Sequence, residues 1–303
     1  MMNKPKSRMQ KFLFSPTINR IGLFLGENLN PKAAEWIIRL ITNKLTKNRD
    51  NEQVSAVRSN QWMASGKKIS GAALDEQVER VYLSSARSIY DYFRCMRKED
   101  QIRKMIHFDD NLVELIERTI AGKESTLGLL IHMGAYDLSG YAMALRGAFP
   151  FVLAYPNPNP GYQWHNELRR KAGIPVESLT MESFHKAVSH LRKGGTVVTG
   201  IDRPWKDGKL KPRFFGEPSD IPVTTIQMAI RTNTPIMVLA CIRQPEGHYI
   251  VHGSQKIEVQ KMKDRNQELL ENTEKVLTVA ETFIRSIPEQ WSMFYPVWPE
   301  ISI

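Results

Sequence analysis

The sequence predicts an α/β fold in which a mostly parallel central sheet is flanked by helices and preceded by an N-terminal helical region. From residue 126 onward, short apolar runs alternate with helical stretches, which is typical of sheets built from strand–helix–strand units. Before about residue 122 the chain shows only helical periodicity. The chain has 303 residues, 42% of them hydrophobic, so it can bury a large core.

The apolar runs of the second part predict strands at 126–131, 151–155, 196–201, 235–242 and 248–253. Helices are expected between and after them, near 137–146, 162–172, 181–193, 222–232 and 265–286. Earlier helices are expected over 31–47, 73–95 and 110–121. We therefore divide the chain into an N-terminal helical region, 1–122, packed on the core and facing a membrane, and an α/β core, 123–303. Together they are expected to form one structural domain.

The predicted helix at 31–47 is amphipathic and basic. Its apolar side carries Trp36, Ile37, Leu40, Ile41 and Leu45. The opposite side and the C-terminal end carry Arg39, Lys44 and Lys47. Such a helix either packs its apolar side on the core or lies in a membrane interface, and the sequence leaves both interpretations open.

The charge of the chain favours anionic partners. Its formal net charge is +10, which attracts nucleic acid, phosphorylated ligands or an anionic membrane surface. The basic residues are spread along the chain, with some crowding at Lys4, Lys6, Arg8, Lys11 and Arg20. No RNA-recognition motif, zinc-finger spacing or helix-turn-helix pattern is evident, so no nucleic-acid partner is expected.

Neither membrane crossing nor export is predicted. The sequence contains no run of about 18 apolar residues. No small-residue cleavage site follows an apolar N-terminal core, as a signal peptide would require. The two cysteines, Cys95 and Cys241, fit a reducing compartment. We therefore expect a protein that is cytosolic or lies on a membrane without crossing it.

Polar side chains follow three of the predicted strands. His132 comes directly after the first, Tyr155 ends the second, and Asp202 and Arg203 follow the third. Ligands of open α/β sheets bind beyond the carboxyl ends of the strands. If these strands are parallel, the side chains share one edge of the sheet.

His132 and Asp137 form the most suggestive pair. Five residues turn an ideal helix through about 500°, which leaves the two side chains roughly 140° apart if both are helical. They can meet if His132 lies on a loop and Asp137 in the first helical turns, with Gly134 allowing the bend. A carboxylate on one imidazole nitrogen leaves the other free to take a proton from a hydroxyl.

No other catalytic or metal-binding pattern stands out. His248 and His252 share a strand face but lack a third ligand, so no metal is expected. Nucleophile-elbow, Walker and dinucleotide motifs are absent from the sequence. A reaction in which the substrate hydroxyl attacks the second substrate directly therefore suits the site better than one with a covalent enzyme intermediate.

The segment HMGAYD, 132–137, is an H-x4-D motif similar to that of the glycerolipid and lysophospholipid acyltransferases. Ordered blocks follow it: NELRRKAGIPV, then GIDRPWKDGKLKPRFFGEP, then IRSIPEQW. This succession, over about residues 55–298, resembles the bacterial lipid A biosynthesis acyltransferases and their actinobacterial relatives, the phosphatidylinositol mannoside acyltransferases. The resemblance implies a glycerol-3-phosphate acyltransferase-like fold.

The resemblance also implies roles for the matching residues. His132 would be the general base and Asp137 its orienting partner. Asp202 and Arg203 would help shape the acceptor site. The basic segment, Arg169 and Arg170, would hold acceptor phosphate or the oxyanion, because an arginine fork pairs with phosphate oxygens.

The block F-F-G supplies further candidates for a pocket. Together with Tyr155 the candidates are Phe214, Phe215, Gly216 and Glu217. Core packing is the alternative for the residues of the F-F-G block.

The implied activity is that of an O-acyltransferase without a cofactor. Its donor would be acyl-CoA or acyl carrier protein, and its acceptor a hydroxyl of a membrane glycolipid or lysolipid. The protein would lie peripherally on the cytoplasmic face of the bacterial plasma (inner) membrane. The alternative is a catalytically silent lipid-binding relative at the membrane surface. SMFYPVWPE stands where the lipid A enzymes commonly carry H-R-R, and no clear anchoring helix precedes the core, so the acceptor stays open.

Overall fold

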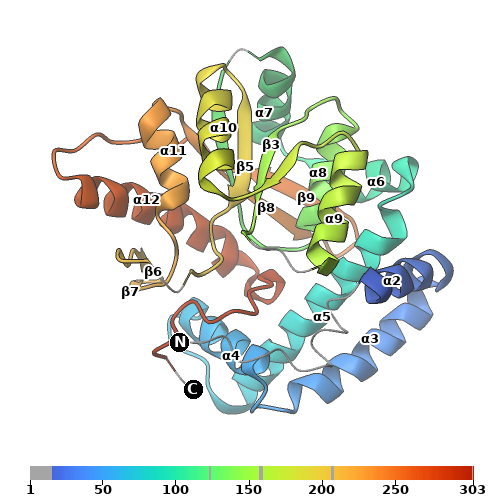
Figure 1. Ribbon diagram of the computed structural model, residues 1–303. Coiled ribbons are helices and arrows are strands. Elements are labelled where there is room, and N and C mark those ends of the chain that lie inside the picture. The colour runs from blue at the N-terminus through green and yellow to red at the C-terminus, as the bar shows by residue number, and fades with distance from the viewer. Residues whose placement is uncertain (1–15, 123, 157–159, 206–207, 302) are drawn as a thin grey trace.

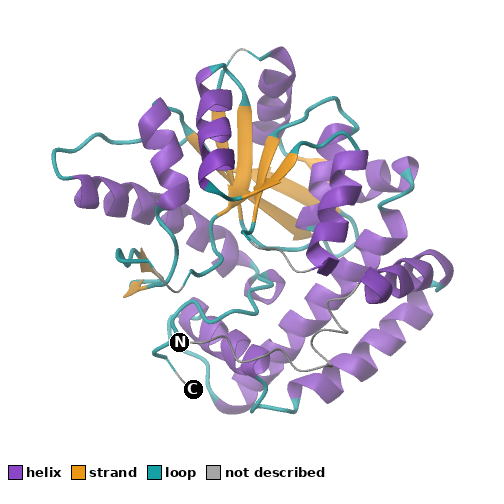
Figure 2. Ribbon diagram, in the orientation of Figure 1, coloured by secondary structure: helices purple, strands orange, loops and turns teal. Residues whose placement is uncertain are grey.

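A seven-stranded sheet forms the centre of the computed structural model, and helices cover both of its faces (Figures 1 and 2). The structure describes residues 16–122, 124–156, 160–205, 208–301 and 303. The basic residues expected to crowd at Lys4, Lys6, Arg8 and Lys11 lie outside this part of the chain.

The strand order is β1-β9-β8-β2-β5-β3-β4. The strands are β1 (Ile106–Phe108), β2 (Thr126–Leu130), β3 (Phe151–Ala154), β4 (Val176–Ser178), β5 (Thr196–Gly200), β8 (Ile236–Arg243) and β9 (Tyr249–Gly253). All neighbours pair in parallel except β8 and β9, which are antiparallel. The predicted mostly parallel sheet is therefore confirmed, with an edge pair, β9 and β1, that runs the opposite way.

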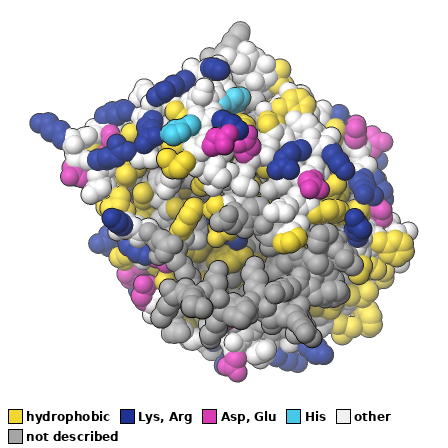
Figure 3. Space-filling model, viewed as in Figure 1, with side chains coloured by type: hydrophobic (Ala, Val, Ile, Leu, Met, Phe, Trp, Pro, Cys, Tyr) yellow, Lys and Arg dark blue, Asp and Glu magenta, His cyan; other side chains and the backbone are white. Residues whose placement is uncertain are grey.

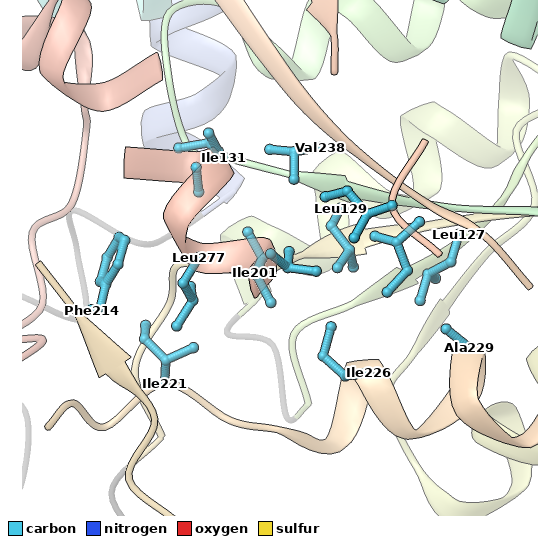
Figure 4. Packing of buried hydrophobic residues seen from close by; sticks show 14 of the residues in the cluster. Leu127, Leu129, Ile131, Ile201, Phe214, Ile221, Ile226, Ala229, Val238 and Leu277 are labelled. Carbon is cyan, nitrogen blue, oxygen red and sulfur yellow. The ribbon is translucent and has the colours of Figure 1, made fainter. Parts of the chain in front are cut away.

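One face of the sheet packs on α10 (Met181–Arg192), α11 (Thr224–Thr232) and α12 (Arg265–Ser286). Leu127 and Leu129 of β2 point to this face, where Ile226 and Leu277 lie among the labelled core side chains of Figure 4. The opposite face packs on α7 (Asp110–Ala121) and α8 (Tyr136–Ala144). Because both faces are covered, β2 is apolar along almost its whole length rather than alternating.

Four N-terminal helices lie together at the lower side of the sheet in Figure 1: α2 (Pro16–Asn28), α3 (Pro31–Thr46), α4 (Glu52–Ala64) and α5 (Gly71–Cys95). The next helix, α6 (Glu99–Met105), lies beside α8. The long helix α5 packs against α2, α3 and α4, and also touches α8. The helix α2 also contacts α9 (Pro160–Lys171). None of the described helices is both long enough and apolar enough to cross a bilayer.

Some elements differ from the sequence prediction. β1 and β4 span only three residues each, too few to show a period, and β1 makes the segment before residue 122 part of the sheet. The helix α4 was not predicted, because it is buried almost all round and has no polar stripe. A short hairpin, β6 (Arg213–Phe214) and β7 (Glu217–Pro218), was also not predicted.

Candidate active site

The central strands β2 and β5 bring His132 and Asp202 together. They pair in parallel, with Leu130 opposite Gly200, so the residues two positions further along each chain leave the sheet side by side. Gly200 makes room for the histidine, since a Cβ there would lie 3.1 Å from its Cε1. His132 and Asp202 therefore meet at the carboxyl end of the sheet, as predicted from the ends of these strands.

The imidazole of His132 is fixed by a single carboxylate. Its Nδ1 lies 2.6 Å from Oδ1 of Asp202, and its backbone N–H donates to Oδ2 of the same residue at 3.0 Å. Its backbone carbonyl accepts from the N–H of Ser292 at 2.8 Å. A carboxylate at Nδ1 selects the tautomer with the proton on that nitrogen, which leaves the lone pair on Nε2.

Asp202 is fully buried and receives a third hydrogen bond. The indole N–H of Trp291 donates to its Oδ2 at 2.8 Å. Burial alone would raise the pKa of this carboxyl, but the His132 ring, the His132 backbone N–H and the Trp291 indole together lower it below its ordinary value. Asp202 is therefore ionised at neutral pH, and its two carboxylate oxygens fix the backbone and the ring of His132.

The prediction that Asp137 orients His132 is wrong for this structure. Asp137 lies in the first turn of α8 and forms an ion pair with Arg169 of α9. The turn before α8 sends the chain away from the histidine: Gly134 has φ 53°, and a Cβ there would lie 2.3 Å from the carbonyl oxygen of Cys241. Gly134 does allow the predicted bend, but the bend turns Asp137 toward α9. Asp202, instead of Asp137, is the carboxylate that contacts the imidazole of His132.

A cavity of about 1250 Å³, including the part open to solvent, begins at His132. It passes between the sheet and the helices α8 and α9. The floor is apolar and crosses neighbouring strands, with side chains Val152, Val198, Leu130, Leu239 and Val251. The helices contribute Asp137, Gly140, Met143 and Arg169, and α7 contributes Leu112. The site thus joins a fixed imidazole to a largely apolar space.

Arg203 lies in the cavity wall between two aromatic rings. Its guanidinium carbon is 3.8 Å from the ring centre of Tyr155 and 4.3 Å from that of Tyr295. Trp205 packs beside Tyr155, with ring centres 6.5 Å apart. Among the described residues no carboxylate pairs with Arg203, in contrast to Arg169. Stacking on the flat faces of the guanidinium leaves its N–H edges available to an anion.

The two predicted phosphate-binding arginines of α9 differ in position. Arg169 is buried in the cavity wall, where it pairs with Asp137 and donates to Asn166. Arg170 is exposed, donates to the carbonyl of Val176 at 3.0 Å and does not line the cavity. Consecutive residues of a helix point about 100° apart, so only one of the pair can face the cavity.

The predicted pocket residues of the F-F-G block do not line the cavity. Phe214 is completely buried and packs on Trp291 and Trp298, with ring centres 5.9 and 5.7 Å away. Phe215 and Gly216 form the turn of the hairpin, and Glu217 pairs with Lys67 on the surface. Core packing is therefore the correct interpretation for the phenylalanines, and they support Trp291 from behind.

Trp291 is the site residue that the sequence reasoning missed. It stands in the P-E-Q-W block, which marked the family resemblance but gave no role for the tryptophan. Met133 and Trp291 form an isolated β-bridge, so this segment lies against the loop of His132. Only the position of the block after the last long helix could have drawn attention to it.

Metal ligands and activated thiols do not contribute to the described site. No group of three His, Cys, Asp or Glu side chains in the described ranges could hold a metal ion. Cys95 and Cys241 are both buried, and burial raises their pKa to about 11 and about 12. Both thiols are therefore protonated at neutral pH and are poor nucleophiles.

Sequence comparisons identify similar proteins. A family model described as "Bacterial lipid A biosynthesis acyltransferase" matches residues 39–300. A phosphatidylinositol mannoside acyltransferase of Mycobacterium tuberculosis (strain CDC 1551 / Oshkosh) is 24% identical over 168 residues, covering 51% of this chain and 52% of that protein. A protein of the same name from a second strain is 24% identical over 146 residues, covering 46% of each chain. The chain thus spans about half the length of the curated relatives it matches.

Proposed function

Because the chain belongs to the bacterial lipid A biosynthesis acyltransferase family, we propose that it transfers a fatty acyl chain from a thioester to a hydroxyl group of a membrane lipid or glycolipid. The observation that carries the proposal is the His132–Asp202 pair at the mouth of the apolar cavity. The pair provides a base of defined tautomer, and the cavity provides space for a hydrocarbon chain.

The proposed reaction is direct transfer. Nε2 of His132 takes the proton of the acceptor hydroxyl, whose oxygen forms a bond with the thioester carbonyl carbon. The tetrahedral intermediate then breaks its carbon–sulfur bond, and the thiolate takes the proton from the imidazolium. Asp202 stays ionised throughout and stabilises the imidazolium, in keeping with its lowered pKa.

The surroundings of His132 favour direct transfer over a covalent enzyme intermediate. Asp202 is the hydrogen-bond partner of the imidazole, and no described serine or cysteine occupies that place. The hydroxyl of Ser139, which lies in the cavity wall, donates to the carbonyl of Tyr136 instead. Both cysteine thiols are buried and protonated.

The apolar part of the cavity is the proposed site of the acyl chain. Its floor consists of valine and leucine side chains from neighbouring strands. Moving a methylene group from water into such a space stabilises binding by about 0.8 kcal/mol. A long chain would therefore supply most of the affinity for the donor.

Arg203 is the proposed contact for a phosphate group. Both acyl-CoA and the prosthetic group of an acyl carrier protein carry phosphate, and so do many lipid acceptors. The guanidinium stacks between Tyr155 and Tyr295, and no carboxylate of the described residues pairs with its N–H edges, so they can bind such an oxyanion. The proposed ligand of Arg203 is a phosphate or phosphodiester group at the cavity mouth. Assays with each donor and each acceptor distinguish whether this group belongs to the donor or to the acceptor.

The N-terminal helices are the proposed membrane contact. Exposed large side chains gather on α2 and α3 (Figure 3): Ile21, Phe24, Leu25, Trp36, Leu40, Ile41 and Leu45. Lys32, Lys44 and Lys47 lie on or beside the same helices and would face anionic headgroups. The apolar side of α3 is thus largely exposed, which favours the membrane interpretation over core packing. The proposed location is the cytoplasmic face of the plasma membrane, which acyl thioesters of the cytosol can reach.

The test is an assay of thioester consumption with acyl-CoA and acyl carrier protein donors. Membrane lipid extracts, including mannosylated phosphatidylinositol and lipid A precursors, serve as acceptors, and mass spectrometry detects the acylated product. The intact protein should form one product, and His132→Ala should lose roughly 10²–10⁴-fold in rate while keeping its fold. A catalytically silent lipid-binding protein would bind the extract without consuming any thioester, and that result would overturn the proposal.

A further inference from the structure

Gly140 occupies the middle of α8, where the backbone does not require a glycine. Its φ is not in the left-handed region, where several other glycines of this chain lie. A Cβ at this position would meet nothing closer than Cδ1 of Ile174, at 3.9 Å, which is ordinary van der Waals contact. Because glycine destabilises a helix interior relative to alanine, its presence here calls for another explanation.

Other glycines around the site have direct steric reasons. Gly134 has a positive φ and would place a Cβ against the carbonyl of Cys241. Gly200 makes room for the His132 ring. A Cβ added at Gly128 would lie 3.1 Å from side-chain atoms of both neighbouring strands. Gly140 has no such neighbour. What it does have is a place in the cavity wall.

The open space beside Gly140 lies inside the proposed acyl site. Gly140 follows Tyr136 by one helical turn, so it lies about 6 Å further along α8 than the residue next to His132. The cavity wall continues past it with Met143 on the same helix and Ile174 opposite. A side chain at position 140 would therefore project into the space that the hydrocarbon would fill.

We propose that Gly140 determines which acyl chains the protein accepts, by leaving open the part of the cavity beyond the first turn of α8. The inference rests on the proposed acyl transfer and names the residue that sets its chain-length specificity. A larger residue at this position shortens the usable cavity and shifts the preference toward shorter chains.

The test uses Gly140→Ala, Gly140→Val and Gly140→Leu with saturated acyl donors that differ in length by two carbons. The preferred length should fall progressively with side-chain size. Each methylene excluded from the cavity weakens binding roughly fourfold, so a two-carbon step should change the ratio of kcat/KM between neighbouring donors by roughly 15-fold.

Ala73→Leu is the control for an enlarged side chain on a helix. Ala73 lies in the first turn of α5, is exposed and does not line the cavity, so its enlargement should leave the length profile unchanged. If Gly140→Leu fails to fold, Gly140→Ala decides, because it should have a Tm at or above that of the parent and a smaller shift of the same sign. An unshifted profile in a folded, active variant overturns the inference. No transfer of any chain by the parent protein overturns the proposed function instead.

Discussion

Nδ1 of His132 lies 2.6 Å from Oδ1 of Asp202, although the two residues are 70 positions apart in the sequence. The carboxylate that is five positions away, Asp137, is bound to Arg169 instead. The site therefore holds two separate polar pairs. One fixes the histidine, and the other joins α8 to α9 in the wall of the cavity.

Trp291→Phe should lower activity by removing one hydrogen bond to Asp202. A hydrogen bond to a charged group contributes about 1.5–3 kcal/mol, so kcat should fall by roughly 10–100-fold. Because the indole N–H helps to lower the pKa of Asp202, its loss should raise that pKa and move the acid limb of the pH–rate profile to higher pH. A variant with an unaltered pH profile and rate would show that the indole does not tune the pair.

Asp137→Asn should destabilise the fold, because it leaves the buried Arg169 without a charged partner. Removing one partner of a buried pair costs about 3–5 kcal/mol, which urea unfolding can measure. The double variant Asp137→Asn/Arg169→Met, which removes both charges, should recover most of this loss. Equal stability of the single variant and the parent would contradict the structural role of the pair.

The burial of His165 should make the protein less stable in acid. Burial lowers its pKa to about 4, so the folded protein binds its proton less readily than the unfolded chain does. The free energy of unfolding should therefore fall as pH drops from about 6.5 to about 4, by up to roughly 3 kcal/mol before allowance for solvent screening.

Denaturant unfolding across this pH range provides the measurement. His165→Gln should lose less stability than the parent over the same interval. His185→Gln, at an exposed position of α10, is the control and should follow the parent curve. A parent and a His165→Gln variant with parallel curves would refute the assignment.

Trp36→Ser and Phe24→Ser should weaken binding to anionic vesicles. Both side chains are about two thirds exposed, at 64% and 65%, and each would bury apolar surface worth about 1.5–3 kcal/mol in a membrane interface. Partitioning of each variant onto the vesicles, measured in a flotation assay, should therefore be at least tenfold weaker than that of the parent. High salt should weaken the partitioning further. Ile120→Ser, on α7 at the other end of the molecule in Figure 1, should bind like the parent. Unchanged binding of all three variants would rule out this face.

The fold was largely predictable because its long strands and helices are governed by local patterns. Strands such as β2 and β8 are buried on both faces and read as continuous apolar runs. The strand ends also placed His132 and Asp202 on one edge. What could not be predicted is the direction in which the chain leaves that edge. The turn at Gly134 decides which carboxylate meets the imidazole, and close approach to Cys241 in β8 fixes that turn.

Trp291 illustrates a second limit of local patterns. It reaches Asp202 from a segment 89 residues further along the chain, held in place by packing on Phe214. No period or spacing within that segment signals the contact. Long-range packing of this kind has no signature in a single sequence.

The central claim is that Asp202, and not Asp137, orients the catalytic base. Single-turnover acyl transfer by Asp202→Asn and Asp137→Asn, each corrected for the folded fraction, tests it most directly. Asp202→Asn should lose roughly 10³–10⁴-fold, because an amide no longer enforces the tautomer with the proton on Nδ1. Asp137→Asn should stay within roughly tenfold of the parent, since its carboxylate does not touch the imidazole. The reverse order, with the greater loss in Asp137→Asn, would contradict the account.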